Sequence, residues 1–68
     1  MGTLTFDVST HERAHQCVTL LRSEGLTVRV VALLPEAHPG VEVDVDTGGA
    51  KWATALVRAV DPGARLRP

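Results

Sequence analysis

The sequence predicts a single α+β domain, residues 1–68, built as a two-layer sandwich with two helices on one face of a short antiparallel sheet. The chain of 68 residues has the length of one domain. Its apolar content of 44% is that of a globular protein rather than a disordered chain. Apolar residues also alternate in some segments, as in strands, and recur every three to four residues in others, as in helices.

The first predicted strand leads directly into the first predicted helix. Thr3 to Val8 alternates between polar and apolar residues, which is typical of a half-buried strand. The segment Ser9–Glu12 matches the S-x-x-E capping box, which predicts that Ser9 caps a helix and that Glu12 bonds back to it. Gly25 is expected to end this helix as a left-handed cap. One apolar stripe recurs between the two ends: Ala14, Cys17, Val18 and Leu21.

The middle of the chain predicts a β-hairpin. Leu26 to Leu34 alternates at first and then becomes apolar throughout, so we expect a second strand there. Pro35 to Gly40 contains two prolines and is expected to be a loop. Val41 to Val45 alternates valine with acidic residues and predicts a third strand, which this short loop joins to the second.

The last part of the chain predicts a second helix and a short end segment. Residues 47–49 break the third strand, and Asp46 or Thr47 is expected to cap a helix from Ala50 to Val60. The segment 61–63, Asp-Pro-Gly, ends that helix. Ala64 to Pro68 is either a frayed tail or a short fourth strand. The stripe of the second helix is Ala53, Leu56, Val57 and Val60.

The element order is therefore β-α-β-β-α with an optional last strand, which predicts a ferredoxin-like antiparallel sheet with both helices on one face. The helix-covered face is expected to carry a set of apolar residues: Leu4, Phe6, Val8, Val28, Val30, Val43 and Val45. The opposite face is expected to carry Thr5, Asp7, Thr27, Arg29, Val31, Leu33, Glu42 and Asp44.

Charge and composition weigh against several functions. The net charge of −1 provides no basic field for nucleic acid or an anionic membrane. The longest apolar run, Val30 to Leu34, is too short to cross a bilayer. Cys17 is the only cysteine, so an internal disulfide is excluded. A free cysteine and a start without signal-peptide features predict a cytoplasmic protein, and we expect no cofactor.

Residues 11–15 read H-E-x-x-H, the zinc-protease pattern. We do not expect a protease, because Arg13 is charged and the chain is too short for a third ligand and a substrate cleft. A weaker alternative is metal binding by His11, His15 and His38, since the first strand–helix loop and the hairpin loop meet at one end of the predicted sheet. Cys17 is a separate candidate, for a nucleophile. It lies on the apolar stripe of the first helix, so we interpret it as a core residue rather than a nucleophile.

The glycine-rich turn before Lys51 has the form of a phosphate cradle, but the Walker pattern is missing and acidic residues precede it.

A protein-partner surface is the stronger prediction. Val31 and Leu33 are apolar on the open face, beside Arg29. If the tail folds over them or the register shifts by one residue, this patch is lost. We interpret Trp52 as a residue at the border of the core, with a partner anchor as the alternative.

The chain resembles small ferredoxin-like regulatory modules: ACT-type domains, heavy-metal-associated domains and prokaryotic signal-transducing domains with a β-α-β-β-α core. The resemblance lies in the Leu4–Val8 strand, the Ala14–Leu21 helix closed by Gly25, the Leu26–Val45 hairpin and the Ala53–Val60 helix. The paired cysteines of the heavy-metal-associated family are replaced by residues 9–11, Ser-Thr-His, so copper transport is not expected.

The sequence thus predicts a non-enzymatic interaction or regulatory module that associates with itself or binds a protein partner. We expect neither nucleic acid nor a membrane as its partner. The alternative is a small-ligand or metal-binding domain that uses the loop end around the three histidines. No acid–base pair or activated nucleophile that would indicate an enzyme can be assembled from the sequence.

Overall fold

The computed structural model describes residues 2–31, 39–46 and 48–67. Two helices and a four-stranded antiparallel sheet confirm the predicted α+β class. The elements follow in the order β1 (Gly2–Asp7), α1 (His11–Ser23), β2 (Thr27–Val31), β3 (Gly40–Val45), α2 (Gly49–Val60) and β4 (Arg65–Leu66). None of the described helices has the length and apolarity needed to cross a bilayer.

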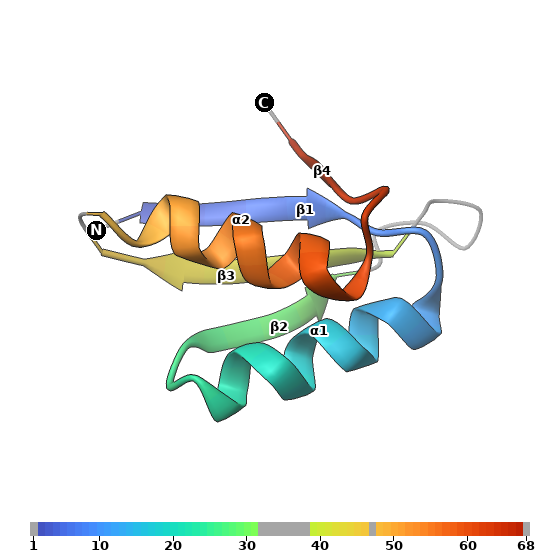
Figure 1. Ribbon diagram of the computed structural model, residues 1–68, viewed down its shortest axis with the longest axis horizontal. Coiled ribbons are helices and arrows are strands. Elements are labelled where there is room, and N and C mark those ends of the chain that lie inside the picture. The colour runs from blue at the N-terminus through green and yellow to red at the C-terminus, as the bar shows by residue number, and fades with distance from the viewer. Residues whose placement is uncertain (1, 32–38, 47, 68) are drawn as a thin grey trace.

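The sheet has the strand order β2-β3-β1-β4, with β3 and β1 in its centre (Figure 1). The antiparallel pairing of β2 with β3 confirms the predicted hairpin partners. Two residues after Ala64 pair with β1, with Leu66 opposite Phe6, so the end segment forms a short fourth strand. β4 and β2 occupy opposite edges of the sheet.

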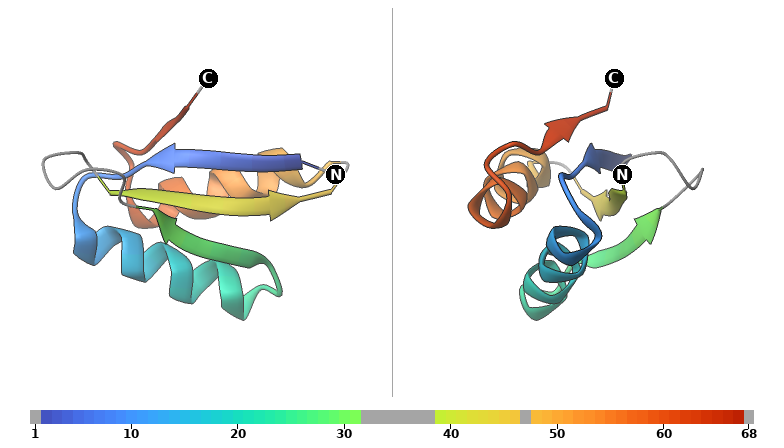
Figure 2. Two further views of the ribbon diagram at one scale, coloured as in Figure 1. Left: turned by 180° about the vertical axis from the view of Figure 1, so that it is seen from behind. Right: turned by 90° about the vertical axis from the view of Figure 1, so that its right-hand side faces the viewer.

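Both helices lie on the same face of the sheet, and the edge-on view in Figure 2 shows the two layers. The strand register places Val43 opposite Leu4 on one side and opposite Val28 on the other. Side chains from the sheet and from both helices meet between the layers. The largest fully buried ones are Phe6, Cys17, Leu21, Val41, Val43 and Val57.

The predicted helix-covered face is correct for most of its residues. Phe6, Val8, Val28, Val43 and Val45 are buried, and Leu4 packs against the core while half-buried.

Val30 is the exception on this face. Its register opposite Val41 places it on the covered side of β2, yet 36% of its surface is exposed. Alternation along a strand predicts which face a residue occupies, but the position of the covering helices decides how deeply it is buried.

The capping box predicted at the start of α1 is wrong. Thr10, in an extended conformation, is the N-cap, and its side chain accepts a hydrogen bond from the Arg13 amide at 3.1 Å. The helix therefore begins at His11, one residue later than a Ser9 cap requires, and Glu12 is its second residue rather than its third. The end of α1 is as predicted, because Gly25 adopts a positive φ of 86° and Leu26 donates back to the Leu21 carbonyl.

Ser9 is instead part of a polar contact between the β1–α1 connection and the end of α2. Asp61, which is 4% exposed, accepts hydrogen bonds from the Ser9 amide at 2.7 Å and from the Ser9 hydroxyl at 2.9 Å. The Gly63 amide donates to the same carboxylate at 3.1 Å. On the neighbouring turn, the Arg13 guanidinium donates to the Val60 carbonyl. These bonds fix the end of α2 to the start of α1.

The pKa of Asp61 reflects two opposing effects. Burial raises the pKa of the carboxyl, but the hydrogen bonds from Ser9 and Gly63 outweigh it and hold the pKa below its ordinary value. Hydrogen bonds to an ionised carboxylate favour its charged form.

Replacing Asp61 by Ala is expected to lower the free energy of unfolding by about 2–3 kcal/mol, because it removes a buried charged acceptor and leaves the partly buried donors of Ser9 and Gly63 without their partner. Ser9→Ala removes only the hydroxyl donor and should cost about 1 kcal/mol. Urea unfolding followed by circular dichroism measures both changes. Equal stability of Asp61→Ala and the wild type would contradict this role for the carboxylate.

Stability is also expected to fall in acid through Asp61. A carboxyl whose pKa is depressed in the folded state stabilises the fold above its unfolded pKa of about 4, and this contribution is lost as the pH falls through the folded value. Urea unfolding at several values from pH 5 down to pH 2 should show a steeper loss for the wild type than for Asp61→Asn. Parallel profiles would contradict the assignment.

Candidate functional site

The structure brings together only part of the predicted metal site. His11 and His15 are exposed, one helical turn apart on α1, whereas His38 lies outside the described residues. The Val8 amide donates to the Pro39 carbonyl at 3.0 Å, so the end of β1 lies beside the segment that enters β3. Within the part of the chain that the structure describes, no three histidine, cysteine, aspartate or glutamate residues are grouped to hold a metal ion. Metal binding at the three histidines stays a prediction.

Cys17 is a core residue, as predicted. It is fully buried, and its Sγ atom lies 3.9 Å from the Val57 carbonyl oxygen. Burial, together with the smaller effect of the nearby Asp61 charge, raises the pKa of the thiol to about 11, although Arg13 acts in the opposite direction. A thiol in this environment is protonated at neutral pH and is not a nucleophile.

Arg29, predicted as part of a partner surface, is already bound within the open face of the sheet. Its Nε donates to Glu42 Oε1 at 2.6 Å, and its NH2 group lies 3.1 Å from Asp44 Oδ1. Thr3 also donates to Asp44, at 3.1 Å. The hydrogen bonds from Arg29 and then Thr3 lower the pKa of Asp44, while the two carboxylates raise the pKa of Arg29.

The apolar patch predicted on this face is described only in part. Val31 is half-buried opposite Gly40, and Leu33 lies outside the described residues. The end segment does not lie over Val31, because β4 pairs with β1 at the other edge of the sheet. Arg67, just after β4, binds Asp7 through Nε at 2.6 Å.

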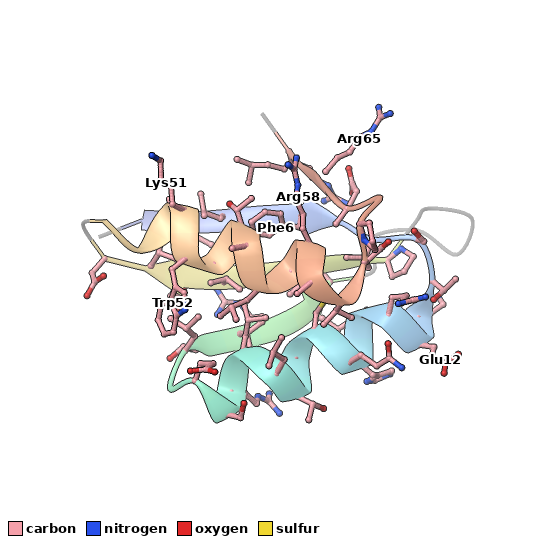
Figure 3. The ribbon with its side chains drawn as sticks, in the orientation of Figure 1. Phe6, Glu12, Lys51, Trp52, Arg58 and Arg65 are labelled. Atoms are coloured by element: carbon pink, nitrogen blue, oxygen red, sulfur yellow. The ribbon has the colours of Figure 1, made fainter. Side chains whose placement is uncertain are left out.

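An open cleft of about 640 Å³ lies at the end of the molecule opposite the Val8–Pro39 contact. The beginning of β1, the α1–β2 turn, the end of β3 and the first turn of α2 line it. Trp52 borders this cleft, and 45% of its surface is exposed. Trp52 is therefore more exposed than a residue at the core border. In Figure 3 its side chain projects from α2 toward β2.

The rim of the cleft is acidic. Glu24, Asp44 and Asp46 contribute to its lining, and no described lining residue is Lys or Arg. Asp44 is bound to Arg29, whereas Glu24 and Asp46 form no ion pair with any described residue. Asp46 does not cap α2 through its side chain, because the N-cap is Gly48 and Asp46 offers its carbonyl to the Gly49 amide at 3.1 Å.

Sequence reasoning did not find this cleft. Its residues come from four segments that only the fold brings together. One signal was present: Trp52 falls beside, not on, the apolar stripe of its helix. A large aromatic residue in that position indicates a surface role as much as a core border.

Comparison with known proteins does not assign the chain to a family. Neither a protein-family model nor a curated protein matches the sequence. The chemistry of the cleft therefore follows from its own residues: an exposed indole, three carboxylate side chains and three glycines.

The Cys17 thiol should resist alkylation in the folded protein. At pH 8, iodoacetamide is expected to react with it at least 100-fold more slowly than with the protein in 8 M urea, because the thiol is inaccessible and protonated. Mass spectrometry of timed samples measures the rate. Similar rates in the folded and unfolded protein would show that Cys17 is open to solvent.

Proposed function

We propose that this chain is a non-enzymatic interaction module that binds a protein partner through the cleft beside Trp52. We also propose that it belongs to the ferredoxin-like plan, which the β-α-β-β-α-β element order and the strand order β2-β3-β1-β4 support. The exposed Trp52 at the cleft is the observation that carries the binding function.

Tryptophan is among the residues that dominate binding energy at protein interfaces, because a large apolar surface is buried with few rotatable bonds. In this chain the indole is 45% exposed and is not among the side chains that pack against the core. Its exposure leaves apolar area available for a partner to cover.

The charge around Trp52 selects the partner's chemistry. The cleft lining offers an Arg or Lys side chain both the Trp52 indole and the carboxylates of Glu24 and Asp46. Cation–π contact and charge attraction act in the same direction there, and arginine combines both most effectively. The cleft is therefore a receptor for a cationic side chain on a protein surface.

An interaction role is preferred to catalysis because the described residues with reactive side chains are not assembled around this cleft. The Cys17 thiol is buried in the core, and His11 and His15 lie on α1, outside the lining of the cleft. The cleft itself offers carboxylates and an indole, which bind charge and apolar surface.

Trp52 is the only tryptophan, so its fluorescence reports binding at the cleft directly. An acetylated Arg-Gly-Arg peptide is expected to shift its emission in a saturable way, and the matching Gln-Gly-Gln peptide is not. The double variant Glu24→Gln/Asp46→Asn should weaken binding by roughly 3- to 10-fold, the effect of losing two exposed charge pairs. Glu12→Gln, which neutralises an exposed carboxylate away from the cleft, serves as the matched control.

Equal responses to both peptides, or equal losses in the Glu12 control and the cleft variant, would refute the proposed site. Trp52→Ala has no tryptophan fluorescence, so its peptide binding is measured by the chemical shifts of the backbone amides in nuclear magnetic resonance spectra. That variant should keep its fold and lose the peptide-dependent shifts at Gly25 and Thr27.

A further inference from the structure

The charges of this chain are divided along the sequence. Four of the seven Lys and Arg residues follow Gly48, whereas seven of the eight Asp and Glu residues precede it. Asp61 is the only carboxylate in that last part of the chain, and it is buried against Ser9. α2 and β4 therefore present cations to solvent with no carboxylate of their own among them.

These cations share one side of the molecule. Figure 3 shows Lys51, Arg58 and Arg65 projecting toward the edge where β4 lies, while Trp52 projects from the other side of α2. None of the three cations forms an ion pair with another described residue, in contrast to Arg67. Leu66, which follows Arg65 in β4, is 47% exposed. We call Lys51, Arg58, Arg65 and Leu66 the basic face.

We infer that the basic face of one copy of this chain docks on the Trp52 cleft of a second copy. The inference rests on the proposed function, because it names the source of the cation that the cleft binds. The cleft offers Glu24, Asp46 and an exposed indole, and the basic face offers guanidinium groups and an exposed leucine. The two surfaces carry opposite charges, and each also exposes a large apolar side chain.

A second copy is favoured over nucleic acid as the occupant. Tight phosphate binding uses many cations along a track, and single-stranded binding adds exposed aromatic platforms. The basic face has only three cations that form no ion pair within the described residues, and it has no aromatic member. The protein as a whole has a net charge of −1, which does not attract nucleic acid. The complementary surface is present on the same chain.

The geometry of this contact determines the kind of assembly. Two different surfaces meet, so the contact is heterologous, and each added copy leaves one cleft and one basic face free. The mean mass should rise gradually with concentration rather than stop at a dimer. Because the charges involved are exposed, salt should weaken the association strongly.

Sedimentation velocity tests this inference from 10 µM to 1 mM protein in 20 mM and 500 mM NaCl. The wild type is expected to associate at low salt and to be monomeric at high salt. Arg58→Gln/Arg65→Gln and Glu24→Gln/Asp46→Asn should each associate more weakly than the wild type when alone. Mixed, they should form a one-to-one pair that grows no further, because one keeps its cleft and the other its basic face. Glu12→Gln should behave as the wild type.

A wild type that is monomeric at 1 mM in low salt, or a mixture that stays monomeric, would overturn the inference. If Arg58→Gln/Arg65→Gln abolishes binding of a labelled single-stranded oligonucleotide and leaves self-association unchanged, the basic face belongs to nucleic acid instead. Peptide-dependent Trp52 fluorescence in a protein that stays monomeric would refute the second copy and leave the proposed cleft intact. Circular dichroism confirms that each variant is folded.

Discussion

The fold depends on the burial of β3 between its neighbouring strands and beneath the two helices. Val41 and Val43 have no exposed surface, and they meet Leu21 and Val57 from the two helices in one core. A chain of 68 residues buries a smaller share of its surface than a larger domain, so it has few such contacts to lose. The positions of the cleft and the basic face follow from this packing, because α2 contributes to both.

The contact between Asp61 and Ser9 links stability to surface charge. By burying the only carboxylate that follows Gly48, it fixes α2 against the start of α1 and also removes negative charge from the surface of α2 and β4. The carboxylate accepts hydrogen bonds from partly buried donors, and α2, which carries Lys51 and Arg58, has no acidic residue of its own. On the open sheet face the arrangement is the reverse, because Arg29 is held between two carboxylates.

The sequence was sufficient for the elements whose signals are local. The alternation before Val8, the helical stripe that ends at Gly25 and the alternating valines of β3 each depend on residues a few positions apart, and the structure confirms them. The start of α1 was missed because Ser9 and Thr10 are both good caps, and the choice between them depends on Asp61, 52 positions away from Ser9. The cleft was missed for the same reason, since four distant segments form it.

The geometry of α2 explains why the basic face would bind the Trp52 cleft of another molecule rather than the cleft of its own. Successive residues of a helix are turned by about 100°, so Lys51 and Arg58 project within about 20° of each other, while Trp52 is turned away from both by about 100° or more. α2 is a continuous helix from Gly49 to Val60 and is fixed by the core at Ala53 and Val57. It cannot rotate to bring its own cations to its own indole. Lys51 and Arg58 therefore cannot reach the indole of their own α2, whereas the same side chains of a second copy can approach it.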